Sequence, residues 1–404
     1  MKNWKILIPL SVLMILSCKE SPTSIGDNFI LQQDRFNILQ HDTLSVSDST
    51  YYDELKPAVT AVSEGLIVGR HNGYVSYGYM LYPIKADDSI LTMLQQGKIN
   101  ITNTWVELRQ FYYVGSKTDP FDFTINLIKN NIDFNTIDKA TYSSVSYDPT
   151  DISYSHTIND TLTKFYLDNT TVKNWLLRTS SDSLSYPNNY GIIMVPTAGT
   201  NKVVGYHSHQ SSTGYAGRIY FAFNKPGVYT DTLAAYVTSD TYHAEINAAS
   251  ANTDKFITLI GGVTYKNSVQ FGIPALPTNA VINKATLQLT IDSTQSWLGT
   301  YTDSTFADIG SLIDVGRLQA KNSVVFDTTT LKFLTRQSSP NRAIYSGDIT
   351  PLVQYWINHN DNYGFSLFVS YEDYYATKLV FYGSKNPDVT KRPKLTITYS
   401  YKNK

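Results

Sequence analysis

The sequence predicts an all-β protein, with two β-sandwich domains of jelly-roll-like topology in tandem after a lipoprotein signal peptide and a tether. Three observations predict this class. Tyrosine is unusually frequent, 31 residues against 17 phenylalanines, and it favours strands and half-wet surfaces. Short runs of Val, Ile, Thr and Tyr alternate with Gly, Asn, Asp and Pro, as strands alternate with turns. The 404 residues exceed what one core usually organises, which favours two cores.

The composition excludes several classes of protein. Lysine and arginine total 33 and aspartate and glutamate 34, so the chain has no overall field for a nucleic acid and we expect no such partner. Hydrophobic residues make up 42% and charged residues 17%, which is enough to pack cores. The single cysteine excludes a disulfide framework and a multi-thiolate zinc site within one chain.

Residues 1–17 have the pattern of a signal peptide, and residues 18–44 that of a lipidated cysteine and tether. Two lysines precede an apolar run, Ile6–Leu16, which is shorter than the ~20 residues of a membrane-spanning helix. The run ends in Ser17-Cys18, which resembles a bacterial lipobox, so we expect Cys18 to be lipidated and to anchor the chain. Lys19 stands where an Asp would resemble an inner-membrane retention signal. We therefore expect the outer membrane, on its periplasmic or its surface-exposed side.

An internal repeat of about 180 residues predicts the domain organisation. The best-matched segments are Ile101–Leu108 with Ile282–Leu289, Val172–Trp175 with Val353–Trp356, and Asn189–Gly191 with Asn362–Gly364. Pro226-Gly227 marks a turn or linker between the copies. We expect a first domain over 45–224, a linker over 225–232 and a second domain over 233–404.

Each copy predicts one short helix, near Val172–Leu177 in the first and Ile349–Asn358 in the second. In both, a valine lies three residues before a tryptophan, the spacing that places two side chains on one helical face. We expect Trp175 and Trp356 to close one end of a sandwich, because large aromatic side chains dominate core burial. The Asn-Tyr-Gly after each helix predicts a turn leading into a strand.

The second copy resembles a known family. The segments that show this are Asp348-Ile349-Thr350 through Val353 and Trp356, Asn362-Tyr363-Gly364 with Leu367, and Arg392-Pro393-Lys394-Leu395 with Ile397 and Tyr399. They resemble the DNRLRE domain over Ser239–Tyr399, while the first copy is a looser match with Arg218-Ile219 in place of Arg-Pro. The resemblance implies a β-sandwich of secreted bacterial proteins, some of them carbohydrate-binding modules with alginate as a ligand. The N-terminal frame, with Ser24-Ile25-Gly26, is also similar to uncharacterised outer-membrane lipoproteins.

The sequence predicts a protein that is not an enzyme. It contains no nucleophile elbow, no His-Glu-x-x-His, no P-loop and no Gly-x-Gly-x-x-Gly. His207 and His209 stand two apart and could share a strand face toward a metal, but a polar face without a ligand is favoured. We expect no cofactor. Calcium is a weak alternative at Asp303, Asp308 and Asp314, which lack the spacing of an EF-hand. Asp87-Asp88 and Glu372-Asp373 are expected as solvated turn charges.

Aromatic side chains offer the best candidates for binding, since a sugar packs its C–H surface on aromatic rings and its hydroxyls on polar groups. The candidate ligand residues are Tyr371, Tyr374, Tyr375, Trp297, Tyr301, Tyr77 and Tyr79, with Tyr74, Tyr112 and Tyr113 beside them. The other interpretation is that these rings cover sheets and contacts between domains. The sequence therefore favours a cell-envelope lipoprotein that binds a polysaccharide. The alternative is a structural or accessory subunit of a cell-surface assembly with a protein partner.

Overall fold

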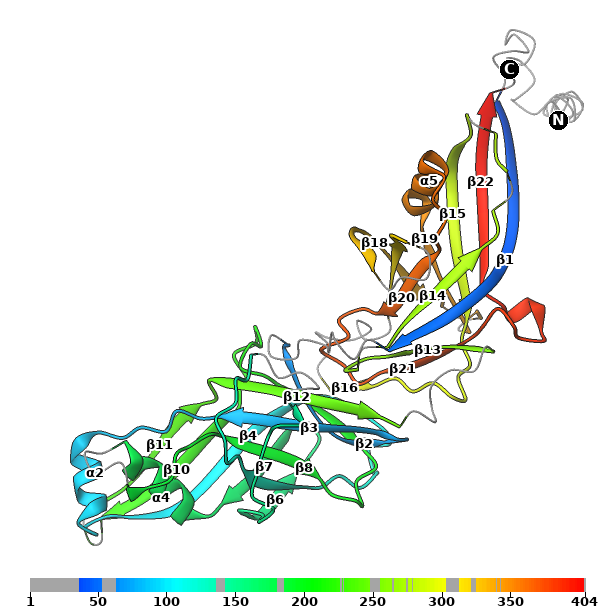
Figure 1. Cartoon of the computed structure of the whole chain (residues 1–404). Helices are drawn as coiled ribbons and strands as arrows, with labels where there is room; N and C mark the ends of the chain where they lie inside the picture. The colour runs from blue at the N-terminus through cyan, green and yellow to red at the C-terminus, as the bar shows by residue number, and fades with distance from the viewer. Residues whose placement is uncertain are drawn as a thin grey trace, which may run out of the picture.

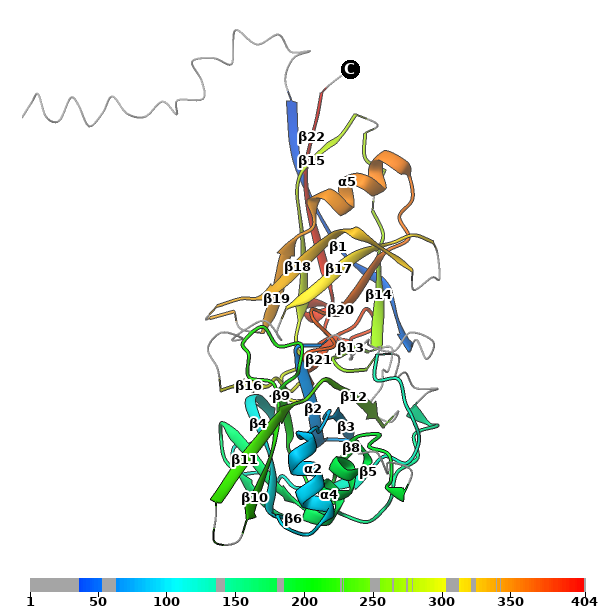
Figure 2. The ribbon, with the colours of Figure 1, turned by 90° about the vertical axis from the view of Figure 1, so that its left-hand side faces the viewer.

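The computed structural model describes residues 36–52, 63–135, 142–179, 185–225, 227, 229–247, 255–263, 265–273, 275–277, 279–302, 312–320, 325–338, 340–341 and 343–402. Strands dominate it, and the expectation of an all-β protein is confirmed at this level. Two large sheets lie end to end along the molecule (Figures 1 and 2). The predicted signal peptide, Cys18 and most of the predicted tether lie outside the described residues.

The first sheet has twelve strands and is formed mainly by the first half of the chain. Its strands are β2 (Gly65–His71), β3 (Tyr74–Leu81), β4 (Asn100–Val114), β5 (Phe123–Leu127), β6 (Ser153–Ile158), β7 (Leu162–Leu167), β8 (Ile192–Pro196), β9 (Val203–His207), β10 (Arg218–Lys225), β11 (Tyr229–Tyr236), β12 (Ser239–Ile246) and β16 (Thr300–Tyr301). Two helices cover it, α2 (Asp88–Gln95) and α4 (Asn169–Arg178).

The second sheet has ten strands. They are β1 (Phe36–Tyr52), β13 (Phe256–Ile260), β14 (Tyr265–Phe271), β15 (Val281–Thr290), β17 (Ile313–Leu318), β18 (Phe326–Arg336), β19 (Ile344–Asp348), β20 (Phe365–Val369), β21 (Lys378–Tyr382) and β22 (Lys394–Lys402). Helix α5 (Thr350–His359) packs on β15, and a 3₁₀ turn, η7 (Val389–Lys391), precedes β22. Alternate residues of β15 are buried, as a strand with one face on the core requires.

Both predicted helices are present and each buries its tryptophan. In α4 the carboxylate of Asp168 accepts the amide of Thr171 as an N-cap, and Val172 and Trp175 are buried. In α5 Val353 and Trp356 occupy the same positions, and the Trp356 ring stacks on a phenylalanine ring of β20. Asp87 is the N-cap of helix α2 and Asp88 is its first residue, so this pair begins a helix and not a turn, although both side chains are exposed as expected. The segment is helical because Leu91 and Leu94, on one helical face, pack into the hydrophobic core of the first sheet, which we call the first core.

The matched Asn-Tyr-Gly segments make matching contacts. The side-chain nitrogen of Asn189 donates to the main-chain oxygen of Tyr82 at 2.8 Å. The side-chain nitrogen of Asn362 donates to the main-chain oxygen of Phe271, also at 2.8 Å. Tyr82 directly follows β3 and Phe271 ends β14, the corresponding strand of the other copy. The glycine after each tyrosine has a φ of +98° or +100°, a conformation that favours glycine. The two copies therefore share local geometry as well as sequence.

The strand pairings correct the expected domain boundaries. Strand β1 pairs with β22 over Phe36–Leu44 and with β14 from Ser45 onward, so residues 45–52 belong to the second sheet. Strands β11 and β12 pair with β10 and β3, so residues 229–246 belong to the first sheet. The expected linker at 225–232 instead includes Lys225 at the end of β10 and residues 229–232 of β11, and Lys225 pairs directly with Tyr229.

Candidate functional site

The tyrosine-rich loop that the sequence predicts as a ligand platform joins the two sheets instead. Tyr375 is 1% exposed, and its ring packs edge-on against Tyr112 and Tyr301, with 5.6 Å between centroids in both pairs. The Tyr112 hydroxyl donates to the main-chain oxygen of Ala376. Tyr374 is half-buried against the first core. Tyr375 is therefore an interface residue and not a sugar platform, and Tyr374 is largely used in the same contact.

Trp297 and Tyr301 are also placed in the contact between the sheets. The Trp297 ring meets His71 and Tyr74 edge-on, with centroid distances of 5.6 and 5.7 Å. The main chain of Trp297 exchanges two hydrogen bonds with Lys378, at 2.9 and 3.0 Å. Tyr301 lies in β16, a strand from the second half of the chain that pairs with β4 in the first sheet. Neither ring forms the open platform expected from the sequence.

Tyr77 and Tyr79 lie in β3 and pack in a small separate cluster with Ile128, Ile132 and Tyr142. Tyr79 is fully buried, and burial raises the pKa of its hydroxyl far above the usual range. Both rings contact Tyr142. Of the seven candidate ligand residues, Tyr371 alone is mostly exposed, at 53%. The alternative interpretation of tyrosines as covers of sheets and contacts thus holds for most of this set.

A different surface presents aromatic rings to solvent. Five adjacent strands of the first sheet follow in the order β11, β10, β4, β7 and β6. Each contributes an aromatic side chain to one face, which we call the aromatic face. Its members, in that order, are Tyr236, Tyr220, Trp105, Tyr166 and Tyr154. Tyr154 and Tyr236 are exposed at 62% and 52%, and the three central rings are half-buried.

The central rings of the aromatic face stand against one another. Trp105 and Tyr220 are stacked with centroids 5.1 Å apart and planes at 10°. The ammonium of Lys164 lies 4.6 Å from the Trp105 centroid and 5.1 Å from that of Tyr166. Tyr166 and Tyr154 follow with centroids 5.8 Å apart. The central rings thus cover part of one another's surface, and the end rings retain more exposed surface.

Polar groups on the same strands surround these rings. Glu107 accepts the indole N–H of Trp105 at 3.0 Å, and its carboxylate lies 3.7 Å from the Lys164 ammonium. The Tyr154 hydroxyl donates to the side-chain oxygen of Asn103 at 2.9 Å. The guanidinium of Arg218 lies 4.4 Å from the Tyr236 centroid. The surface therefore combines flat apolar rings with donors and acceptors of both charges.

The sequence does contain a signal for the aromatic face. Strand β4 alternates buried and half-buried residues, with Thr104, Val106 and Leu108 inside and Trp105 outside. Strand β10 likewise buries Ile219 and leaves Tyr220 outside. An aromatic residue on the polar side of an alternating strand is the sign of a surface ring. The candidates from the sequence were aromatic residues close together along the chain, whereas the aromatic face takes one ring from each of five strands.

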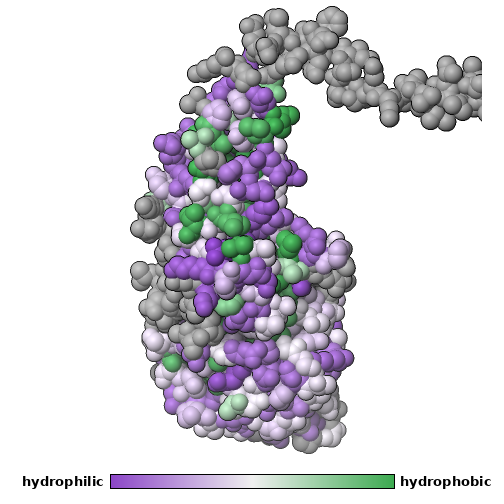
Figure 3. Space-filling view, turned by 90° about the vertical axis from the view of Figure 1, so that its right-hand side faces the viewer, coloured by the Kyte–Doolittle hydropathy of each residue, from purple (hydrophilic) through white to green (hydrophobic). Residues whose placement is uncertain are grey.

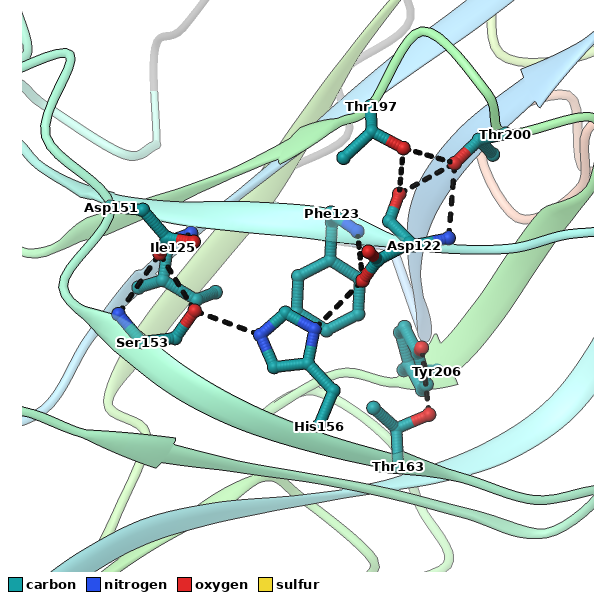
Figure 4. Close-up of polar contacts among 10 residues, drawn as sticks. All are labelled: Asp122, Phe123, Ile125, Asp151, Ser153, His156, Thr163, Thr197, Thr200 and Tyr206. Atoms are coloured by element: carbon teal, nitrogen blue, oxygen red, sulfur yellow. Dashed lines mark hydrogen bonds and ion pairs between the residues drawn. The ribbon is translucent and has the colours of Figure 1, made fainter.

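Beside the aromatic face lies an open hollow of about 590 Å³ with a serine, a histidine and an aspartate in hydrogen-bonded order (Figure 4). Ring atom Nε2 of His156 lies 2.8 Å from the Ser153 hydroxyl, and Nδ1 lies 2.8 Å from the Asp122 carboxylate. The Ser153 hydroxyl donates to Oδ1 of Asp151 at 2.6 Å. This carboxylate oxygen also accepts the main-chain N–H groups of Ser153 and Ile125.

This arrangement matches a turn that recurs along the chain. Four other aspartates accept the hydroxyl and the amide of a threonine two residues later, at Asp292, Asp327, Asp348 and Asp388. The Ser153 hydroxyl is therefore engaged in an Asx turn. His156 stacks on Phe123 and links the start of β5 to β6. The hydrogen bonds among Ser153, His156 and Asp122 therefore connect β6 to the start of β5.

His207 and His209 have different hydrogen-bond partners among the described residues. His207 is 3% exposed, and its Nδ1 lies 3.0 Å from the Ser211 hydroxyl. His209 lies beyond the end of β9, with Nδ1 2.8 Å from the carboxylate of Asp240. That hydrogen bond raises the pKa of His209, and burial raises the pKa of Asp240. The expected shared strand face is thus wrong.

Within the described part of the chain, no group of three or more His, Cys, Asp or Glu residues is placed to hold a metal ion. Of the calcium candidates, Asp314 is buried, and Asp303 and Asp308 lie outside the described residues. None of the described helices is long and apolar enough to cross a bilayer. Comparison of the chain with protein families, with curated proteins and with solved structures finds no match.

Proposed function

We propose that this protein is a non-enzymatic cell-envelope lipoprotein that binds a polysaccharide along the aromatic face. The observation that supports this most is the row of aromatic side chains from five adjacent strands. Four strand spacings of ~4.8 Å make the row about 19 Å long, which suits an extended chain better than a small molecule. Exposed aromatic surface of this extent is uncommon on a protein without a partner.

The chemistry of the face fits a polyhydroxylated ligand. The exposed rings Tyr154 and Tyr236 offer apolar surface for sugar C–H groups at the two ends of the row. Between them, Asn103, Glu107 and Lys164 offer an amide, a carboxylate and an ammonium for hydroxyls. Glu107 lies 3.7 Å from Lys164, and Arg218 adds a second cation, so the face also accepts a ligand with scattered negative charge.

The proposal includes the architecture and address expected from the sequence. Each half of the chain would be a β-sandwich with jelly-roll-like topology, as the DNRLRE resemblance implies. Lipid on Cys18 would hold the protein at the outer membrane with no further membrane segment. Metabolic labelling with a fatty acid, and its loss in Cys18→Ala, tests the anchor independently of any ligand.

A structural or accessory role is the second candidate, and strand β11 favours it. Among the described strands β11 pairs with β10 alone, so its other edge has unpaired main-chain groups. A partner protein could add a strand there. A stoichiometric partner recovered from detergent-solubilised membranes without glycan dependence would favour this role.

The test of glycan binding is an affinity-gel screen of residues 19–404 against neutral and acidic polysaccharides, with and without Ca²⁺. Tyr154→Ala and Tyr220→Ala remove rings of the aromatic face, and Tyr371→Ala removes an exposed tyrosine elsewhere. We expect retardation of the wild type and of Tyr371→Ala, and its loss in the two face variants. Absence of retardation in every gel, with the protein folded, would contradict the proposal.

A further inference from the structure

The end of the molecule at which β1 begins carries exposed apolar side chains. Phe36 and Ile38 are 66% and 67% exposed, and Val281 is 56% exposed. Ile38 and Val281 both pair with Ser400, from opposite sides of β22, so they lie on neighbouring strands around one position. Figure 3 shows hydrophobic groups on the half of the molecule that contains β1. We call Phe36, Ile38, Leu39 and Val281 the apolar tip.

Aromatic and cationic residues border the apolar tip. Leu39, 46% exposed, pairs with Tyr399, which stacks on Tyr401 with 6.3 Å between centroids. Phe36 pairs with Lys402. Aliphatic and phenyl groups flanked by tyrosine and lysine are typical of protein surfaces that rest in the headgroup region of a bilayer.

The position of the tip in the chain indicates what covers it. Phe36 follows Cys18 by 36 − 18 = 18 residues. A chain of that length reaches at most ~65 Å when extended and averages ~23 Å when flexible. Phe36–Leu39 are therefore the described residues nearest to Cys18 along the sequence, and a lipid on Cys18 would keep the bilayer at a high effective concentration around the tip.

We propose that the apolar tip rests in the headgroup region of the bilayer that holds the lipid of Cys18. This inference depends on the proposed lipidation. Figures 1 and 2 place the strands of the aromatic face at the far end of the molecule from the start of β1. Contact of the tip with the membrane would therefore point the aromatic face away from it, toward a ligand in solution or on a neighbouring surface.

The experiment uses the full-length lipidated protein in vesicles of phosphatidylethanolamine and phosphatidylglycerol. Cys18 is the only cysteine, so attachment of the lipid to its sulfur leaves Ile38→Cys as a single thiol for an environment-sensitive dye. The matched control is Val389→Cys, an exposed apolar position beyond the opposite end of β22. We expect nitroxide-labelled lipids to quench the dye at position 38 about threefold more than at 389, with a blue-shifted emission. Replacing Phe36 and Val281 with serine should remove that difference.

Equal quenching at the two positions in lipidated protein would overturn the inference. A blue shift at position 38 without lipid quenching, together with a concentration-dependent dimer, would assign the tip to a second copy and also overturn it. Failure of the anchor is separated by repeating the measurement on Cys18→Ala protein held on nickel-chelating lipids through an N-terminal histidine tag. Quenching there would support the tip even if Cys18 is not acylated.

Discussion

The hydroxyl of Tyr242 donates a hydrogen bond to the main-chain oxygen of Asp373 at 2.6 Å, across 131 positions of sequence. Tyr242 lies in β12 of the first sheet, and Asp373 lies in the loop between β20 and β21 of the second. The Ser63 hydroxyl reaches the same oxygen at 2.7 Å. This loop is thereby held on the first sheet, which explains why its tyrosines are not available to a ligand.

Removal of that hydroxyl tests the contact between the sheets. We expect Tyr242→Phe to lower the free energy of unfolding by about 1 kcal/mol, the usual worth of one buried hydrogen bond. The effect stays moderate because Ser63 still donates to the Asp373 oxygen. Tyr236→Phe is the control, because its ring is 52% exposed. Denaturant titration of both variants gives the comparison, and equal stabilities would contradict the contact.

The carboxyl of Asp373 predicts a pH dependence of stability. The sequence predicts a solvated turn charge here, but burial raises the pKa of Asp373 from 3.8 to about 6. Because the carboxyl binds its proton more tightly in the folded state, it stabilises the fold fully at a pH below 3.8, the pKa in the unfolded chain. That contribution is lost as the pH rises through about 6, the pKa in the folded protein. We expect a loss on the order of 1–2 kcal/mol between pH 4 and pH 7, allowing for solvent screening.

The matched variant for this pH dependence is Asp373→Asn, which cannot ionise. Thermal unfolding followed across the same pH range should show a flatter profile than the wild type. An unchanged slope would show that Asp373 titrates near its ordinary pKa.

The two helix tryptophans predict large losses of stability. Trp356 is 2% exposed and stacks on Phe365 with centroids 4.1 Å apart, and Trp175 is 4% exposed. We expect Trp356→Ala and Trp175→Ala each to cost about 3–5 kcal/mol, because each leaves a cavity in a core. Trp105→Ala should cost far less, since its ring is half-buried on the aromatic face. Chemical unfolding would contradict this account if all three variants were equally destabilised.

The asparagines of the repeated Asn-Tyr-Gly segments predict matching effects in the two copies. Asn189→Ala and Asn362→Ala each deprive a main-chain oxygen of its amide donor. We expect each to destabilise the protein by about 1–2 kcal/mol. Asn188→Ala, at the exposed neighbouring position, should be close to neutral. A clear effect in one copy only would show that the two turns are not equivalent.

Local features of the fold were predictable from the sequence. The two helices followed from a valine and a tryptophan at helical spacing, and the positive-φ turns followed from Asn-Tyr-Gly. These features depend on neighbours in sequence. The strand alternation of β15 was predictable for the same reason.

Pairings between distant segments were not predictable. Nothing in Phe36–Tyr52 indicates that it pairs with β22 and β14 rather than with the strand that follows it. Likewise, Pro226-Gly227 suits a hairpin as well as a linker. The burial of Tyr375 depends on rings of the opposite sheet, which no local pattern can reveal.

The most direct test of the central claim measures ligand affinity on two matched tyrosine variants. Tyr154→Ala lies on the aromatic face, and Tyr371→Ala lies on the loop that joins the sheets, with both side chains mostly exposed in the wild type. Calorimetric titration with the polysaccharide retained in the gel screen should show at least about a tenfold weaker affinity for Tyr154→Ala, from a lost stacking contact. Tyr371→Ala should bind like the wild type. Loss of affinity in Tyr371→Ala with Tyr154→Ala unchanged would place the ligand on the loop and contradict the account.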